Sequence, residues 1–298
     1  MILLRTIAIG ALALALAAPL VAHEAPEPIV VGESHTLTAL DAERRVNVLL
    51  PPDYATSGRD YPLVVMLDGG RDQDLFLAYG LYRWNAMWQR SEPAIVVGIE
   101  TVDRQRELLP ATKDAVERER YATAGESTAF REWLAEEVLP MLREQYRDDG
   151  RAVLIGESAA GHFVAETWMK RPDLFTGYAA ISPSLQWDGE ALSRELAAMD
   201  AAARPPLYLS LADEGGATES GIIRFLGSAG GEVCFSDRRA DLVHANTLHG
   251  LLPEALQYLL PTEADWLEEY GLTLRCTNAE RGLGDNEGEP DAGGAGAD

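Results

Sequence analysis

The sequence predicts an α/β fold with a mostly parallel central sheet and helices on both faces. Short apolar runs alternate with helical patterns along most of the chain, and several runs, such as PLVVML and AIVVGI, are apolar at almost every position. Runs of this kind are typical of strands that are covered on both faces. The 298-residue chain, 47% hydrophobic, is long enough to bury the core that such a sheet requires.

The elements follow one another in an order that favours this fold. Strands are expected at residues 45–50, 62–67, 94–100, 152–156, 177–181, 207–211 and 232–236. Helices are expected at residues 75–89, 128–146, 160–170, 191–199, 221–228 and 253–260. The order predicts two or three antiparallel strands that open the sheet, followed by βα units. Because residues 30–275 show no repeat and no linker, we expect a single large α/β domain there.

The two ends differ in composition from this domain. Residues 1–22 have the pattern of a cleavable secretory signal, with Arg5 before a short apolar stretch and small residues up to Ala22. The apolar stretch is short for a membrane span, so we expect export to the periplasm or secretion without stable membrane insertion. Residues 277–298 are rich in glycine and acidic residues, and we expect a disordered tail.

Charge and cysteine content limit the classes of partner. The formal net charge of -23 disfavours nucleic acid as a ligand. The two cysteines, Cys234 and Cys276, could form a disulfide in an oxidising compartment or remain as two buried thiols. No motif implies a metal or an organic cofactor, and the sequence carries no signal for an oligomeric state.

The segment Gly156-Glu157-Ser158-Ala159-Ala160-Gly161 joins an expected strand to an expected helix. G-x-S-x-G at such a junction is typical of a nucleophile elbow, in which a sharp turn exposes the serine hydroxyl. The glycines at 156 and 161 are needed where strand and helix approach closely. An ordinary tight turn with an incidental serine is the alternative, which this context disfavours. Ser158 is therefore the candidate nucleophile.

A glycine turn after another strand could stabilise the oxyanion. Asp68-Gly69-Gly70 follows the strand PLVVML directly, and its backbone N–H groups could face a bound substrate. We expect the N–H groups of Gly70 and Ala159 to form the oxyanion hole, although which N–H of the turn is used stays open.

A serine nucleophile needs a base, and histidine is the usual one. His249 lies in Leu248-His249-Gly250, expected to be a loop before a helix that opens with Pro253. That position favours His249 as the base over His244, which is closer to the last strand. His162, one residue after the elbow, is expected to pack or cap rather than to react.

The acid that orients the histidine is expected between the serine and the histidine in the chain. Asp213 and Glu214 follow the strand at 207–211, and Asp241 lies closer to the histidine. The residues alone leave these three candidates open.

Three further side chains are candidates for substrate contact. Arg104 and Arg106 follow the strand AIVVGIE, where they could bind an anionic group or pair with neighbouring acids. Trp187 lies beyond a strand end, where we expect a substrate pocket. Trp84 and Trp88 share a helix face and could line a pocket or pack in the core.

Several of these segments resemble a known family. The strand followed by LDGG, the segment Arg104–Pro110, GESAAG, the SPSLQW segment at 182–187 and the Leu248-His249-Gly250 loop together resemble the putative esterase family of α/β-hydrolases, over roughly residues 30–262. This family contains esterase D, enterochelin-type siderophore esterases and mycolyl transferases. The resemblance is nearer to the siderophore-esterase branch, in which a glutamate after the penultimate strand is the acid, and this favours Glu214 over Asp213.

These features together predict an exported serine esterase with an α/β-hydrolase fold and a small-molecule ester as substrate. Ser158, His249 and Glu214 would form the triad and pass through a covalent acyl-enzyme. The alternatives are an acyltransferase of the same family and a non-catalytic binding module on the same fold.

Overall fold

The computed structural model describes residues 27–199, 203–274 and 276. Its contacts separate two units, Met1–Val30 and Val31–Asp298. In the first unit the described residues, 27–30, are exposed and have no regular secondary structure. The expected signal segment at 1–22 and the expected tail at 277–298 lie outside the described residues.

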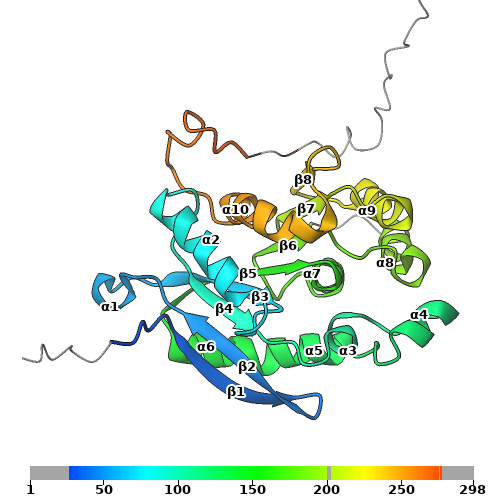
Figure 1. Cartoon of the computed structure of the whole chain (residues 1–298), viewed down its shortest axis with the longest axis horizontal. Coiled ribbons are helices and arrows are strands. Elements are labelled where there is room, and N and C mark those ends of the chain that lie inside the picture. The colour runs from blue at the N-terminus through cyan, green and yellow to red at the C-terminus, as the bar shows by residue number, and fades with distance from the viewer. Residues whose placement is uncertain (1–26, 200–202, 275, 277–298) are drawn as a thin grey trace, which may run out of the picture. The chain divides into compact units, whose positions relative to one another are not determined.

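The second unit is built on an eight-stranded sheet in the order β1-β2-β4-β3-β5-β6-β7-β8 (Figure 1). Its strands are β1 (Glu33–Ala39), β2 (Ala42–Leu49), β3 (Tyr61–Leu67), β4 (Ile95–Ile99), β5 (Asp148–Glu157), β6 (Gly177–Ile181), β7 (Leu207–Leu211) and β8 (Val233–Asp237). β1 pairs antiparallel with β2, and β2 antiparallel with β4, whereas the other neighbours pair in parallel. The predicted α/β-hydrolase architecture is therefore confirmed.

β1 is absent from the strands that the sequence predicts. Its sequence, ESHTLTA, alternates between exposed and half-buried positions. An edge strand of this kind has no continuous apolar run, the pattern that predicts the other strands.

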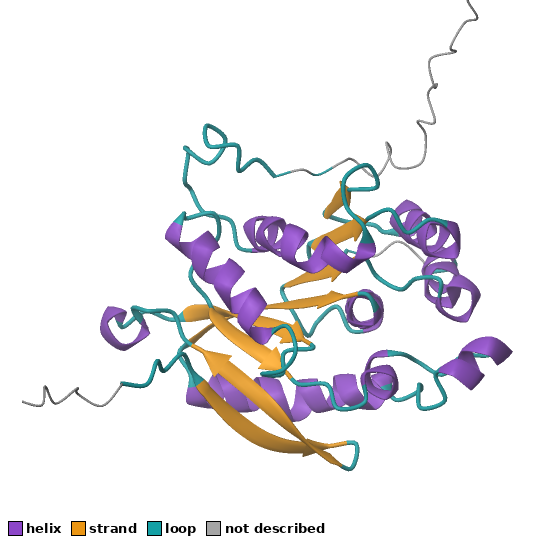
Figure 2. Ribbon diagram, viewed as in Figure 1, coloured by secondary structure: helices purple, strands orange, loops and turns teal. Residues whose placement is uncertain are grey.

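Helices cover both faces of the sheet (Figure 2). Along β3, Leu63, Val65 and Leu67 belong to one buried cluster, and Val64 and Met66 belong to a second. The first cluster contains side chains of α5 (Ser127–Trp133), α6 (Leu139–Gln145), α7 (Ala159–Lys170), α8 (Trp187–Ala197) and α9 (Gly216–Ser228). The second contains side chains of α2 (Leu75–Met87) and α10 (Thr247–Leu259). The alternation along β3 thus separates the two helix layers.

The helices agree with the prediction in position and differ in detail. The helix expected at 128–146 is divided into α5, the π-helical turn η1 (Leu134–Val138) and α6. Three short helices were not predicted: α1 (Tyr54–Ser57), α3 (Arg104–Leu108) and α4 (Ala115–Arg120). Elements of one or two turns are too short to show a helical period in the sequence.

α10 begins earlier than the sequence predicts, and this matters for the site. The sequence predicts a helix that opens with Pro253, but the helix runs from Thr247 through Pro253 to Leu259. A proline inside a helix lacks the N–H that would bond to the carbonyl four residues before it, here that of His249. His249 therefore lies in the first turn of α10 and not in a loop.

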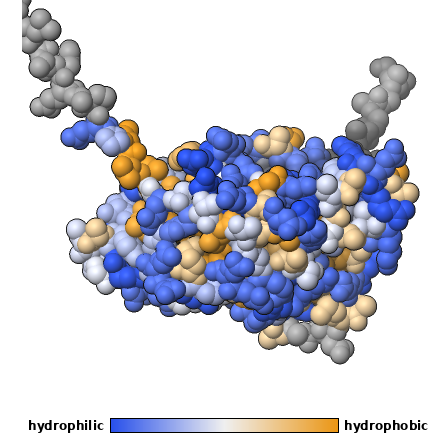
Figure 3. Space-filling model, turned by 90° about the horizontal axis from the view of Figure 1, so that it is seen from below, coloured by the Kyte–Doolittle hydropathy of each residue, from blue (hydrophilic) through white to orange (hydrophobic). Residues whose placement is uncertain are grey.

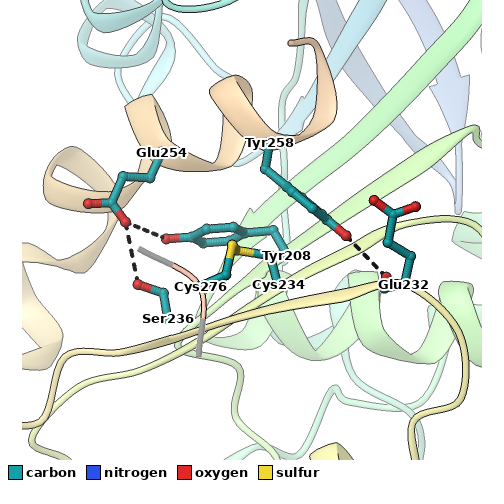
Figure 4. The surroundings of a disulfide bond; sticks show 7 residues. All are labelled: Tyr208, Glu232, Cys234, Ser236, Glu254, Tyr258 and Cys276. Carbon is teal, nitrogen blue, oxygen red and sulfur yellow. Dashed lines mark hydrogen bonds between the residues drawn. A yellow bond between two sulfur atoms is a disulfide. The ribbon is translucent and has the colours of Figure 1, made fainter. Parts of the chain in front are cut away.

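A disulfide joins Cys234 of β8 to Cys276 (Figure 4), with 4.8 Å between the two Cα atoms. This settles the alternative between a disulfide and two thiols. Around it, Glu254 of α10 accepts hydrogen bonds from the hydroxyls of Tyr208 and Ser236, at 3.3 and 3.4 Å. The bond closes the chain that follows α10 back onto the edge strand of the sheet.

One face of the surface can be described by its hydropathy. The face in Figure 3 is mostly hydrophilic, with hydrophobic residues in small groups. Within the described residues, none of the helices combines the length and the apolar character that a membrane span requires.

Candidate active site

Ser158 lies in the sharp turn between β5 and α7. Its backbone has φ +61° and ψ −117°, a conformation that non-glycine residues rarely adopt. A Cβ on Gly156 would lie 2.6 Å from the backbone of Ala160, and one on Gly161 would lie 2.9 Å from the carbonyl oxygen of Ile181. The predicted strained turn, with no room for side chains at 156 and 161, is confirmed.

Hydrogen bonds hold this turn against the end of β6. The backbone N–H of Ser158 donates to the carbonyl of Ile181 at 3.1 Å, and the N–H of Ser184 donates to the carbonyl of Ser158 at 3.0 Å. The Oγ atom of Ser158 is 3.4 Å from that of Ser184. Among the described residues, no hydrogen bond between Ser158 and His244 or His249 is present.

Glu214 follows β7 and is paired with His244. Its Oε1 atom is 3.0 Å from Nδ1 of the imidazole and also accepts the hydroxyl of Ser182. The other carboxylate oxygen accepts the N–H of Ala212 at 3.0 Å. With only 6% of its side chain exposed, Glu214 is held by three donors and is well placed to orient an imidazole. Asp213, the alternative acid, is exposed.

The expected pairing of Glu214 with His249 is therefore corrected. His249 is exposed in the first turn of α10, and it has no hydrogen-bond or ion-pair partner among the described residues. His244 lies in the short 3₁₀ turn η2 (His244–Asn246) between β8 and α10. The sequence also places His244 after the last strand. Because α10 begins at Thr247, His244 and not His249 lies in the segment between β8 and this helix.

The second ring nitrogen of His244 also faces a carboxylate. Nε2 is 3.4 Å from Oε1 of Glu157, which accepts the hydroxyl of Thr247 at 3.0 Å. Both histidines and Glu157 line a cavity of about 250 Å³, together with Asp74, Leu77, Ala245 and Leu248. Glu157 was not predicted as a site residue, although it is the variable position of the elbow motif.

The charges around His244 favour its protonated form. The hydrogen bond to Glu214 is the largest effect that raises the pKa of His244, with Glu157 adding to it against the opposing effect of burial. Burial raises the pKa of Glu157 itself. The nearest histidine to the elbow in sequence, His162, is buried with Nδ1 3.0 Å from the carbonyl of Ser184, and burial lowers its pKa. It packs, as predicted.

The glycine turn after β3 is partly engaged. The N–H of Gly69 donates to the carbonyl of Ile99 at 2.8 Å, and that of Gly70 donates to Oε1 of Gln73, also at 2.8 Å. Ala159 is the first residue of α7, so its N–H has no acceptor within the helix. The two N–H groups expected in the oxyanion hole therefore differ in availability. The N–H of Ala159 has no acceptor within its helix, whereas that of Gly70 would have to leave Gln73 before it could bind an oxyanion.

The two arginines occupy different places. Arg104 donates to Asp68 at 2.8 Å and to the backbone carbonyl of Glu157 at 3.1 Å, so it connects the glycine turn to the elbow. Arg106 instead pairs with Glu126 at 2.9 Å and donates to the carbonyl of Leu40. Of the two candidate arginines, Arg104 therefore lies beside the elbow, whereas Arg106 is paired with groups elsewhere.

None of the three candidate tryptophans lines the cavity beside His244. Trp187 is buried, donates its indole N–H to the carbonyl of Pro110 at 3.0 Å, and lines a separate cavity of about 260 Å³ with His162 and Lys170. Trp84 and Trp88 are 39% and 36% exposed on α2, with ring centroids 6.1 Å apart. They belong neither to the core nor to the cavity beside His244.

No metal site accompanies these residues in the described part of the chain, where no group of three or more His, Cys, Asp or Glu side chains is arranged to hold an ion.

Comparison with known proteins places this geometry in context. A family model described as putative esterase matches residues 38–209, more than half of the chain. Ferri-bacillibactin esterase BesA of Bacillus subtilis (strain 168) is 30% identical over 109 residues, which are 32% of this chain and 38% of that protein. The match therefore spans well under half the length of this relative.

Solved structures share the fold at lower identity. An IroE-like serine hydrolase from Shewanella oneidensis superposes with a TM-score of 0.66 at 20% identity, covering 81% of this chain and 86% of the other. The siderophore hydrolase EstB from Aspergillus nidulans gives 0.68 at 19% identity, covering 85% and 100%. The family match, over the segment that carries the elbow, the glycine turn and most of the parallel strands, shows that this chain belongs to the putative esterase family of α/β-hydrolases.

Proposed function

We propose that the protein is a serine hydrolase that cleaves carboxylic esters, with Ser158 as nucleophile, His244 as base and Glu214 as the acid that orients it. The observation that carries the proposal is the 3.0 Å contact between Glu214 and Nδ1 of His244, on the loop that follows the last strand. With Nδ1 donating to the carboxylate, Nε2 is the nitrogen that accepts a proton. Nε2 is directed to Glu157, the residue adjoining the nucleophile.

The reaction would proceed in two steps. Ser158 Oγ attacks the ester carbonyl while His244 takes the hydroxyl proton, and the tetrahedral intermediate then expels the alcohol, which receives that proton. Water attacks the acyl-enzyme by the same route and releases the carboxylic acid. The hydroxyl of Ser158 would turn from Ser184 to His244 when substrate binds, in keeping with the looser hydrogen bonds of catalytic groups in unliganded enzymes.

Backbone N–H groups would stabilise the oxyanion. The N–H of Ala159, at the positive end of α7, is one donor, and Gly70 is the other once its N–H leaves Gln73. Arg104 supports both, because it joins Asp68 of the glycine turn to the elbow.

The names of the relatives suggest the first substrates to test. BesA is named as a ferri-bacillibactin esterase and EstB as a siderophore hydrolase, so we propose a siderophore-type ester as the substrate class. A panel with a triscatecholate trilactone, a hydroxamate siderophore ester and p-nitrophenyl acetate would rank the classes by kcat/KM. Values of kcat/KM for both siderophore esters no higher than that for the simple ester would contradict this assignment.

Labelling with a fluorophosphonate tests the chemistry itself. The wild-type protein should become labelled at one site and lose its p-nitrophenyl acetate hydrolysis, whereas Ser158→Ala should neither label nor turn over, with kcat reduced by roughly 10³-fold or more. Ser184→Ala is the matched control, since it removes the neighbouring hydroxyl and leaves the nucleophile. Label retained in Ser158→Ala would contradict the proposal.

We also propose that the protein is exported. The signal-like pattern at 1–22 supports this. The Cys234–Cys276 disulfide supports it independently, because such bonds persist in oxidising compartments. Expression of the full chain in a bacterial host, followed by fractionation and N-terminal sequencing, should yield a mature protein that begins near residue 23.

A further inference from the structure

The imidazole of His244 lies between two carboxylates. Nδ1 is 3.0 Å from Glu214, and Nε2 is 3.4 Å from Glu157. The hydroxyl of Thr247 donates to the same oxygen of Glu157 at 3.0 Å and so fixes the carboxylate in place. Serine hydrolase chemistry requires the first of these contacts but has no need of the second.

The second contact has a chemical cost for a base. A base must present an unprotonated nitrogen to the serine hydroxyl, whereas a carboxylate facing that nitrogen favours the imidazolium, in which both nitrogens donate. In the proposed reaction Nε2 takes the proton of Ser158, so the carboxylate of Glu157 and the serine hydroxyl would compete for the same nitrogen.

We propose that Glu157 is a positioning residue that holds His244 next to the nucleophile and sets the pH above which the enzyme is active. This inference rests on the proposed role of His244 as the base. Glu157 contacts the histidine and is not itself required to exchange a proton with substrate.

The other charged groups near His244 do not outweigh its contacts with Glu157 and Glu214. Asp74, directly before α2, lines the same cavity and adds negative charge. His249 of α10 also lines this cavity and has no partner among the described residues. On α3, Arg104 opposes protonation of His244, but its guanidinium is paired with Asp68 at 2.8 Å. Two carboxylates in direct contact with the ring therefore outweigh one cation that is already neutralised.

The sign of the effect follows from these contacts. Both carboxylates raise the pKa of His244 above its ordinary value, so neutral His244 forms only at higher pH. Removing the charge of Glu157 lowers that pKa, and the rise of activity with pH then moves to more acidic solution. Loss of a merely structural contact would reduce the rate or the stability without changing the pH at which activity rises.

Titration of the histidine tests the inference directly. The C2 proton of His244, assigned by its absence in His244→Ala, should titrate in Glu157→Gln with a pKa lower than in the wild-type protein by roughly 0.5–1 unit. The acid limb of kcat/KM for p-nitrophenyl acetate should move by the same amount. Glutamine keeps the size of the side chain and can still accept the hydroxyl of Thr247.

Asp213→Asn is the matched control. It removes one negative charge from the loop that carries Glu214, but Asp213 is exposed and no contact joins it to His244. The change in the pKa of His244 in Asp213→Asn should be less than a third of the change in Glu157→Gln. Equal shifts in the two variants, or no shift in Glu157→Gln, would overturn the role of Glu157.

The two proposals fail in different ways. If Ser158→Ala or His244→Ala keeps full activity, the proposed triad is wrong, whereas the NMR titration still reports whether Glu157 sets the pKa of His244. If the triad variants are inactive and the titration does not move, the triad stands and Glu157 has no such role.

Discussion

At the scale of single residues, the site depends on which histidine reaches Glu214. A shift of five positions along the chain separates His249 from His244, yet it moves the imidazole from an exposed helix turn to the carboxylate. The ring nitrogen and the carboxylate oxygen must lie within about 3 Å for the histidine to be oriented. Position in the chain therefore limits the candidates to His244 and His249 but does not distinguish between them.

Replacing the two histidines tests this choice. His244→Ala should reduce kcat for p-nitrophenyl acetate nearly as much as Ser158→Ala, because nucleophile and base act as a unit. His249→Ala should retain most of the activity, since His249 only lines the cavity. Steady-state kinetics of the two purified variants, with circular dichroism as a check of folding, decides between them. The reverse order of damage would restore the expectation drawn from the sequence.

Replacing the acid tests how His244 is oriented. Glu214→Gln should lower kcat by about 10-fold or more and lower the pKa of His244, because the hydrogen bond to Glu214 is the largest effect that raises it. The acid limb of the pH–rate profile should therefore move toward lower pH as the plateau falls. Asp213→Asn should leave the plateau nearly unchanged, and a larger loss there than in Glu214→Gln would exclude Glu214 as the acid.

At the scale of elements, the turn from β5 into α7 depends on contacts between backbones. The amide of Ser158 reaches the end of β6, and Gly161 lies against Ile181 and Pro183. The close approach of helix and strand presents the serine at the carboxyl edge of the sheet, where α/β proteins place their sites.

Adding one methyl group to this turn should be costly. In Gly161→Ala the new Cβ would lie 2.9 Å from the carbonyl of Ile181 and 3.0 Å from Cα of Pro183, and neither backbone can move freely. We expect a loss of roughly 1–3 kcal/mol in the free energy of unfolding, measured by urea denaturation.

A glycine in another helix serves as the control. A Cβ on Gly80 of α2 would meet nothing within 4 Å. Gly80→Ala should raise the free energy of unfolding by up to about 1 kcal/mol, because alanine favours the helix. If both variants behave alike, the packing argument at Gly161 is wrong.

At the scale of the whole molecule, the disulfide ties the segment after α10 to the edge of the sheet. Cys234 and Cys276 are 42 residues apart in the chain, and the loop between them contains η2 and α10. His244 lies within this closed loop, so the bond limits the conformations of the unfolded chain around one candidate catalytic residue.

Removing the disulfide should lower stability measurably. For a loop of 42 residues, the loss of chain entropy corresponds to about 4 kcal/mol, and strain or residual structure commonly reduces this to about 2–4 kcal/mol. The double variant Cys234→Ser/Cys276→Ser should unfold at correspondingly lower urea concentration. Reductant should destabilise the wild-type protein and leave the double variant unchanged. A wild-type midpoint that does not respond to reductant would contradict this account.

Local sequence patterns were enough to predict the class of fold and to mark Ser158 as the candidate nucleophile. Apolar runs report strands buried on both faces, and the glycines around Ser158 report a turn in which a Cβ does not fit, because both are properties of local segments. The edge strand β1 and the short helix α3 could not be predicted, since neither has a distinctive local pattern.

Which charged groups lie in contact depends on the folded arrangement of distant segments. Glu214, His244 and Glu157 come from three different strand ends, and their contacts depend on where the parallel strands stop and where α10 begins. The same holds for Arg104, which reaches the elbow, and Arg106, which does not. Hydrogen bonds act over about 3 Å, a distance that no spacing along the chain specifies between segments as far apart as these.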